Sequence, residues 1–233
     1  MIEHLRKVPL FSELSDDNLL SIAQLGHVDA VPPNTMVLQE GDKGDALFIV
    51  LEGRVKICYY APDGREVILS ILEEGQFFGE MALLACSTRS ATVITMTTSR
   101  LAQIRCQDFK ELLRRHPEIA VGMLAEVTGR LRRTSQLLER LSTMNVPARL
   151  YMLILDQCHQ TRALLPSEQT EHFPVIELPI HQVLADQIAT SRETVSRAIS
   201  RLKKNGILTP VEGRHNFFRV DVRALETLTQ IMV

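Results

Sequence analysis

The order of apolar and polar residues divides the chain into a strand-rich segment followed by a helical one. Between Val31 and Ile104, short apolar runs alternate with turn signals such as "EGDKGD", "LEG" and "APDGRE". Apolar and polar residues alternate in "RVKICYY" and "REVILSIL", which is the period of strands with one buried face. Several such strands, separated by Gly and Asp turns, predict a barrel or β-sandwich rather than βαβ units. A short helix is expected before them, within residues 8–26, where "SDD" is a capping signal.

After Ile104 the apolar period becomes that of helices. A first helix is predicted to end near His116–Pro117, and a longer one to continue to about Met144. Pro147 breaks the pattern and marks a domain boundary. Further on, residues 162–179 form a polar, Pro-containing connection that ends in the strand-like "VIEL".

The longer helix carries an apolar seam of leucines seven residues apart, namely Leu124, Leu131 and Leu138. Thr134 and Ser135 interrupt this seam with polar side chains near its middle. A heptad seam flanked by charges is typical of helices that pair between two copies of a chain. We therefore expect a homodimer; the alternative is a helix that lies on its own domain.

The end of the chain has the pattern of a winged helix-turn-helix. Two short helical patterns, 180–188 and 191–204, are joined by "ATS". They are followed by "GILTPVEGRHNFFRV", which predicts a β-hairpin that turns near Glu212–Gly213. Helix, turn, helix and a two-stranded wing is an arrangement that places its second helix in the major groove of DNA.

The charge of the whole chain is −2, so no global positive field attracts nucleic acid. A local basic region coincides, however, with the second short helix and the wing. Only Glu193 and Glu212 oppose the basic residues there, which are Arg192, Arg197, Arg201, Lys203, Lys204, Arg214 and Arg219. A basic stretch alone is usually a solvated face, but a basic helix together with a basic wing indicates double-stranded DNA as the partner.

The sequence gives little support for a membrane protein, a secreted protein, a metalloprotein or an enzyme. The longest apolar run, "ALFIVL", is far too short to span a bilayer, and no secretory signal is evident, so we expect a cytoplasmic protein without a membrane partner. The seven histidines show no ligand spacing, and the four cysteines lack the spacing of metal or disulfide frameworks. We expect no metal, no catalytic residues and no enzymatic activity. The cysteines are Cys58, Cys86, Cys106 and Cys158.

The stretch "GEMALLACSTRSATV" (79–93) places one acid, Glu80, and one base, Arg89, among small and apolar residues. With "FFGEMALL…TRSATV", "LRRTSQ" in the long helix and "TSRETVSR" in the second short helix, the chain resembles the cyclic-AMP receptor (catabolite activator) branch of the bacterial CRP/FNR regulators. The resemblance covers roughly residues 8–220. It implies an α+β fold: an N-terminal cyclic-nucleotide-binding β-roll (1–116), jelly-roll-like, a dimerisation helix and hinge (117–145), and a winged helix-turn-helix (146–233).

The residue types suit a cyclic phosphodiester. A buried anion needs a cation and oriented N–H donors. Arg89 supplies a guanidinium fork and Ser90 a hydroxyl, while Glu80 can accept from a ribose 2′-hydroxyl. The expected ligand residues in this stretch are Gly79, Glu80, Met81, Ala82, Arg89, Ser90 and Ala91. The alternative is a plain Glu80–Arg89 salt bridge in an empty roll.

The resemblance also assigns a role to the polar interruption of the seam. In the family, the residues at the positions of Thr134 and Ser135 contact the adenine amino group, one from each subunit. This implies cyclic AMP as the effector. Cyclic GMP and cyclic di-GMP remain alternatives, as does a ligand-independent or redox sensor on the same fold.

The DNA contacts are expected from the helix-turn-helix and the wing. Ser191 is the predicted N-cap of the second helix. Ile180 stands where the family often has Thr, and the loop around Val211–Arg214 is one residue longer than in the catabolite activator. The expected DNA-binding residues are Gln182, Ser191, Arg192, Glu193, Ser196, Arg197, Lys203 and Arg214. RNA polymerase is a further expected partner.

Overall fold

The computed structural model describes residues 2–11, 14–85, 87–164 and 173–232 of the chain. The chain forms two compact units, Met1–Arg133 and Thr134–Val233, which divide inside the long helix α5 (Pro117–Thr143). Each unit has its own hydrophobic core. The domain limits derived from the sequence lie elsewhere, at 116/117 and 145/146, and stay predictions. Part of the predicted polar connection, 165–172, lies outside the described residues.

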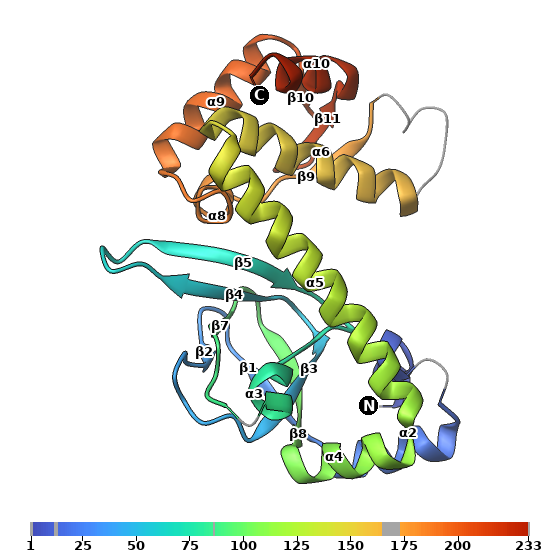
Figure 1. The fold of residues 1–233 in the computed structure, drawn as a ribbon. Helices are drawn as coiled ribbons and strands as arrows, with labels where there is room; N and C mark the ends of the chain where they lie inside the picture. The colour runs from blue at the N-terminus through green and yellow to red at the C-terminus, as the bar shows by residue number, and fades with distance from the viewer. Residues whose placement is uncertain (1, 12–13, 86, 165–172, 233) are drawn as a thin grey trace. The chain divides into compact units, whose positions relative to one another are not determined.

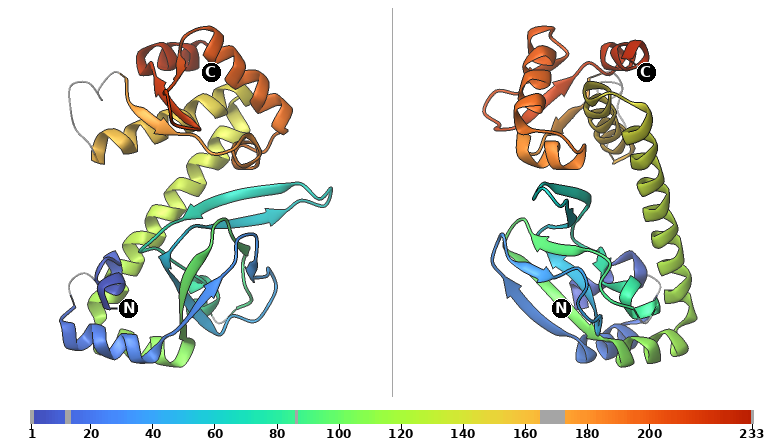
Figure 2. Two further views of the ribbon diagram at one scale, coloured as in Figure 1. Left: turned by 180° about the vertical axis from the view of Figure 1, so that it is seen from behind. Right: turned by 60° about the vertical axis from the view of Figure 1, so that its left-hand side comes forward.

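The N-terminal unit is built on strands, as the alternation predicted. Within its described part, these strands form two antiparallel sheets with the orders β1-β8-β3-β6 and β2-β7-β4-β5 (Figure 1). The hairpin of β4 and β5 projects beyond the rest of the strands (Figure 2). The strands are β1 (His27–Val31), β2 (Met36–Leu38), β3 (Ala46–Glu52), β4 (Val55–Tyr60), β5 (Glu66–Leu72), β6 (Phe77–Phe78), β7 (Thr92–Thr95) and β8 (Ser99–Arg105).

The apolar run "ALFIVL" does not alternate because both faces of β3 are covered. Leu47, Ile49 and Leu51 belong to the cluster formed with the helices. Val50, on the opposite face, packs with Val93 and with side chains of other strands from both sheets. A strand with two buried faces reads as a continuous apolar run, so the run marks the centre of the roll.

Short helices close the roll, and their limits agree with the signals in the sequence. Ser15 caps α2, because its Oγ accepts a hydrogen bond from the backbone N–H of Asn18 at 3.4 Å. The first helix predicted after Ile104 is α4, which is capped at its C-terminus by His116. Pro117 begins α5, and its missing N–H costs nothing there because the first N–H groups of a helix have no partner within the helix. The helices before α5 are α1 (Ile2–Arg6), the 3₁₀ turn η1 (Pro9–Phe11), α2 (Asp16–Leu25), α3 (Glu80–Ala85) and α4 (Cys106–Arg115).

Helix α5 exposes the leucines of the predicted seam. Leu124, Leu131 and Leu138 are each 66% exposed in the single chain, and Val121 is 67% exposed. Large apolar side chains scattered singly are normal on a surface, but a regular stripe of them marks an interaction face. The stripe is consistent with the predicted pairing of two copies.

The C-terminal unit has the predicted order of helix, turn, helix and hairpin. Asn145 caps the N-terminus of α6, because its Oδ1 accepts a hydrogen bond from the backbone N–H of Ala148 at 3.0 Å. The wing contains three strands in the order β10-β11-β9. The elements are α6 (Val146–Leu164), β9 (Val175–Glu177), α8 (His181–Gln187), α9 (Arg192–Lys204), β10 (Leu208–Pro210), β11 (Phe217–Val220) and α10 (Val222–Met232).

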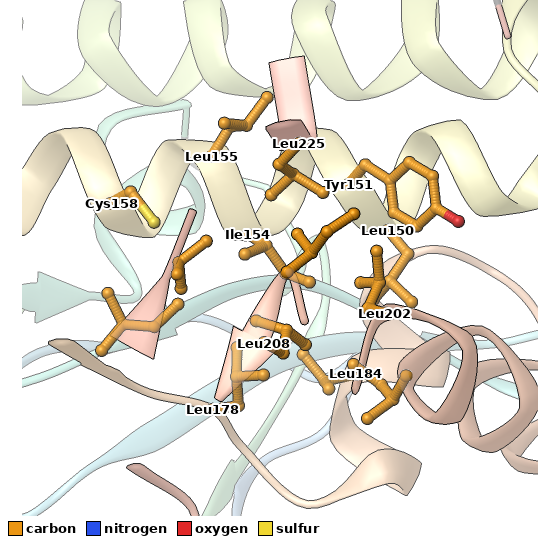
Figure 3. Close-up of a cluster of buried hydrophobic side chains, with 14 of the residues drawn as sticks. Leu150, Tyr151, Ile154, Leu155, Cys158, Leu178, Leu184, Leu202, Leu208 and Leu225 are labelled. Carbon is orange, nitrogen blue, oxygen red and sulfur yellow. The ribbon is translucent and has the colours of Figure 1, made fainter. Parts of the chain in front are cut away.

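The core of this unit forms around α6. Figure 3 shows Leu150, Ile154 and neighbouring side chains of α6 meeting residues from the helix-turn-helix and the wing. Helix α10 adds Val222 and Leu225 to the same core. The sequence analysis did not predict α10; its apolar residues at 222, 225 and 228 have helical spacing and were the available signal.

One buried hydroxyl should contribute measurably to the stability of the N-terminal unit. Thr95 is fully buried; its Oγ1 donates to the carbonyl of Pro32 at 2.6 Å and accepts from the backbone N–H of Thr35 at 2.9 Å. Thr95→Val keeps the shape but removes the hydrogen-bond partner of two backbone groups, which costs about 1–3 kcal/mol. Urea unfolding should show this loss. Thr209→Val, at an exposed strand position, is the control, and an equal midpoint shift in both variants would contradict the assignment.

Candidate functional site

The stretch 79–91 forms a compact loop around Arg89, here called the cassette. Gly79 follows β6 with a φ of 84°, a left-handed conformation that favours glycine. Helix α3 begins at the next residue, Glu80. After α3, the chain returns to place Arg89 inside the unit, where its residue is 4% exposed. A cation and an acid that are nine residues apart in sequence therefore both lie in one buried region.

The guanidinium of Arg89 is held by backbone carbonyls. Nη1 donates to the carbonyl of Gly79 at 2.9 Å and Nη2 to that of Ala46 at 3.0 Å. Its Nε is buried and has no hydrogen-bond partner among the described residues. Nη2 of Arg89 forms an ion pair with Oδ1 of Asp45 at 3.8 Å, but the side chain of Asp45 is 87% exposed. Burial lowers the pKa of Arg89 from its usual range, and Asp45 and then Glu80 oppose that shift.

Two glycines make room for this buried cation. A Cβ at Gly79 would lie 2.6 Å from Nη1 of Arg89. A Cβ at Gly44 would lie 2.2 Å from the Cβ of Ala82. Real Cβ atoms do not approach other atoms so closely, so Gly79 lets the backbone approach the guanidinium, and Gly44 lets its segment approach Ala82 of α3. The small residues of the cassette are thus required by the geometry around Arg89.

Glu80 is paired with a residue other than Arg89. It is 6% exposed, and its Oε1 accepts from Nη1 of Arg130 on α5 at 3.3 Å. Among the described residues, no ion pair joins Glu80 to Arg89. Burial raises the pKa of Glu80, and the charge of Arg130 opposes that shift. The alternative of a plain Glu80–Arg89 salt bridge is therefore not what the described residues form: Arg130 is the cation in contact with Glu80, while Arg89 and Glu80 stabilise each other's charge without a direct ion pair.

Arg130 was not predicted from the sequence, where it counted only as one of the charges that flank the seam. Nη2 of Arg130 donates to the carbonyl of Phe77 at 2.6 Å, and Nε donates to Glu126 at 3.0 Å. Its guanidinium also lies over the ring of Phe77, 4.7 Å from the centroid. The Glu126–Arg130 spacing of four residues was visible in the sequence, but the contact with Glu80, fifty positions away, was not.

The other cassette residues line the same loop with different exposures. Met81 and Ser90 are exposed, Ala82 is buried and Ala91 is half-buried. The hydroxyl of Ser90 lies 3.4 Å from the sulfur of Met81. Tyr59 of β4, a second residue missed in the sequence, donates its hydroxyl to the carbonyl of Ser90. This bond ties the β4–β5 hairpin to the cassette.

Thr134 and Ser135 are exposed on α5 and begin the second compact unit. Their expected contact with a base, each from a different subunit, stays a prediction.

The second helix of the helix-turn-helix presents the expected polar residues away from the core. Val195, Ile199 and Leu202 of α9 are buried. Ser191 caps the helix, with its Oγ accepting from the N–H of Thr194 at 3.3 Å. Among the residues of α9 that are predicted to contact DNA bases, Arg192, Glu193 and Arg197 are exposed. Ser196 is half-buried.

The remaining predicted DNA contacts lie on the first helix, the end of α9 and the wing. Gln182, in the first turn of α8, donates to Oδ1 of Asp186 at 2.8 Å. The ammonium of Lys203 lies over the ring of Phe218, 4.6 Å from the centroid. Arg214, in the turn of the wing, is exposed and lies over the ring of Phe217. Ile180 directly precedes α8 and is exposed, with no side-chain capping bond.

Within the described ranges, no three His, Cys, Asp or Glu residues form a group that could hold a metal ion. Cys58, Cys106 and Cys158 form no disulfide in the part of the chain that the structure describes, and Cys86 lies outside that part. Burial raises the pKa of Cys58 to about 12, with the nearby carboxylate of Glu66 adding to the shift, so this thiol is inert. Among the helices that the structure describes, none combines the length and apolarity needed to cross a bilayer.

Two family models match the chain. Residues 28–116 match a cyclic nucleotide-binding domain, and residues 148–228 match a Crp-like helix-turn-helix domain. The cAMP-activated global transcriptional regulator CRP of Haemophilus influenzae is 29% identical over 184 residues, which are 78% of this chain and 80% of that protein.

Solved structures have the same fold. The c-di-GMP responsive global regulator CLP of Xanthomonas campestris matches with a TM-score of 0.71 and 24% identity, over 88% of this chain and 99% of that one. The catabolite activator protein of Thermus thermophilus matches with a TM-score of 0.53 and 27% identity, over 97% and 100%. The two domains in this order, the relatives and the fold agree: the chain belongs to the CRP/FNR superfamily of DNA-binding transcription regulators.

Proposed function

We propose that the chain is a transcription regulator that binds cyclic AMP in the cassette and, as a homodimer, binds a palindromic DNA site. The observation that carries the ligand site is the state of Arg89. Its guanidinium is buried, its Nε has no partner among the described residues, and its one ion pair is with a solvent-exposed carboxylate. A buried cation with an unused donor fits a ligand that brings a negative charge.

Different cassette residues would bind the phosphate and the ribose of the ligand. The cyclic phosphate would take the free N–H of Arg89 together with the exposed hydroxyl of Ser90, next to the backbone of Gly79 and Ala91. Glu80 would accept from the ribose 2′-hydroxyl. Arg130 holds Glu80 from α5, so the carboxylate is fixed before a ligand arrives. The ligand supplies the anion, and the protein supplies preformed donors and acceptors.

The choice of cyclic AMP rests on two supports. The hydroxyls of Thr134 and Ser135 can accept a hydrogen bond from the amino group of adenine. Because a hydroxyl can also donate a hydrogen bond to the carbonyl oxygen of guanine, these residues favour adenine but do not exclude guanine. The H. influenzae relative is named as cAMP-activated. The CLP structure is titled as c-di-GMP responsive, but at 24% identity it shows the fold alone. Cyclic di-GMP is the alternative effector, and the ligand titration below separates the two.

Regulation would connect the cassette to the DNA-binding unit through α5. Arg130 links α5 to Glu80 and to the backbone of Phe77, so changes at the ligand reach this helix. At the other end of α5, Arg140 forms a two-bonded ion pair with Asp156 of α6, across the predicted hinge near Met144–Pro147. We infer that this region reorients when the ligand binds. As a transcription regulator, the protein would act together with RNA polymerase in the cytoplasm.

Replacing Arg89 should remove ligand binding. Breaking a buried charged contact costs about 3–5 kcal/mol, so Arg89→Leu should weaken cyclic AMP binding by about two to four orders of magnitude. Calorimetric titrations with cyclic AMP, cyclic GMP and cyclic di-GMP measure this directly. Arg100→Leu, which removes an exposed guanidinium paired with Glu52, is the control. Unchanged affinity in a folded Arg89→Leu protein would refute the cassette as the ligand site.

Dimerisation should not require the ligand. The seam of Leu124, Leu131 and Leu138 is exposed in the single chain and does not include cassette residues. Sedimentation of the ligand-free protein at micromolar concentration should therefore show a dimer. Leu131→Glu, at the centre of the seam, should produce monomers, because it buries a charge between two helices. A ligand-free wild-type monomer would argue against this prediction.

Two basic residues of α9 should differ in how they affect DNA recognition. Arg197 is exposed in the second turn of α9, on the same face as Glu193. The match of this helix to the catabolite activator implies half-sites similar to TGTGA. Arg197→Ala should cost about 1–3 kcal/mol and relax the preference at one base pair. Lys203→Ala should weaken binding to all sequences alike. Selection from random DNA tests both, and a result with no inverted repeat, or one insensitive to Arg197, would overturn the assignment.

A further inference from the structure

A cavity of about 390 Å³ lies in the C-terminal unit, between the start of α8, one face of α9 and the wing. Its wall includes the apolar side chains of Ile199 and Phe218. The ionisable side chains that line it are His181, Arg192 and Lys203, and no carboxylate is among its lining residues. The cavity is therefore a small positive site within the DNA-binding unit.

The two permanent cations stand on one side of α9. Arg192 and Lys203 are eleven residues apart, which is three turns of a helix, so both point to the same face. Lys203 is held over the ring of Phe218. The acidic residue of α9, Glu193, is not among the lining residues. An oxyanion entering the cavity would meet two cations and no repelling charge.

His181 is the third ionisable group and the one that titrates. It begins α8 and is half-buried. Burial lowers the pKa of its imidazole from the ordinary 6.5, and the charges of Lys203 and Arg192 lower the pKa further. On α8 itself, the one acidic side chain, Asp186, accepts a hydrogen bond from Gln182. From the wing, the lining residues are Asn216 and Phe218, neither of which is charged. The imidazole is thus neutral near pH 7 in the free protein.

We propose that this cavity receives one backbone phosphate of bound DNA, and that His181 takes up a proton from solvent when the phosphate enters. The proposal rests on the proposed DNA-binding function. The phosphate oxygen accepts from the imidazolium N–H, and its negative charge compensates Arg192 and Lys203, which otherwise repel the proton. No such role was assigned to His181 from the sequence.

The sign of the pH dependence follows from this exchange. The phosphate raises the pKa of His181 in the complex above its lowered value in the free protein. DNA affinity therefore increases as pH falls from above the pKa of the complex towards the pKa of the free protein, and becomes constant below both. One proton changes the affinity by at most about tenfold per pH unit.

The test uses the full chain with saturating cyclic AMP and a labelled duplex that carries TGTGA half-sites as an inverted repeat. Fluorescence anisotropy at constant ionic strength should show wild-type affinity rising by about three- to tenfold per half-site between pH 8 and pH 6. His181→Gln keeps a neutral donor and should show no such rise. His181→Arg should bind tightly and equally at both pH values. His215→Gln, at an exposed histidine of the wing turn, is the matched control and should keep the wild-type rise.

The outcomes separate this proposal from the proposed function. An equal pH dependence in wild type and His181→Gln, or none in wild type, overturns the proton-linked site while DNA binding stands. A duplex that fails to bind at every pH contradicts the DNA-binding function instead. A third arm adds millimolar AMP without DNA and follows the His181 ring resonance by NMR. A shift of that resonance by AMP, with no shift on adding duplex, would assign the cavity to a small anion and overturn the DNA-phosphate proposal.

Discussion

The burial of one guanidinium determines how the N-terminal unit is arranged around its ligand site. Taking a charge out of water is costly unless hydrogen bonds and an opposite charge replace the lost hydration. Arg89 receives two backbone carbonyls, and these reach it only because Gly79 adopts a left-handed conformation and has no Cβ. In the described part of the chain, the buried Nε of this group has no hydrogen-bond partner. The turn between β6 and α3 and the small residues of the cassette follow from this arrangement, and the proposed anionic ligand would complete it.

The second buried charge links that site to the rest of the protein. Glu80 cannot remain buried and ionised without a cation, and the cation in contact with it comes from α5. The same helix carries the exposed leucine stripe, and near its end Arg140 bonds to α6. The partner of the cassette acid and the leucine stripe proposed to pair two copies therefore share one continuous helix. If the ligand binds as proposed, the side chain that neutralises Glu80, Arg130, is also the one that would carry the signal to α5.

Local signals in the sequence were sufficient for most of the fold. Periodicity, the Ser15 and Ser191 caps and the Pro117 start predicted many of the strands and helices, although not α10, because each of these signals depends on residues close together in the chain. Contacts that arise only from folding were not predictable in this way. Arg130 meets Glu80 from fifty residues away, and Tyr59 bonds to a backbone carbonyl that no residue type reveals. The environment of His181 likewise depends on α8, α9 and the wing coming together.

The position of Arg130 also limits how the protein can be divided. The strands and the cassette end well before residue 117, so a ligand sensor built from residues 1–116 would contain every strand of the roll. It would lack Arg130, however, so Glu80 would lose the cation that now contacts it. Such a fragment would no longer fix the orientation of this carboxylate through an ion pair. A minimal biosensor from this chain therefore has to include the first four turns of α5.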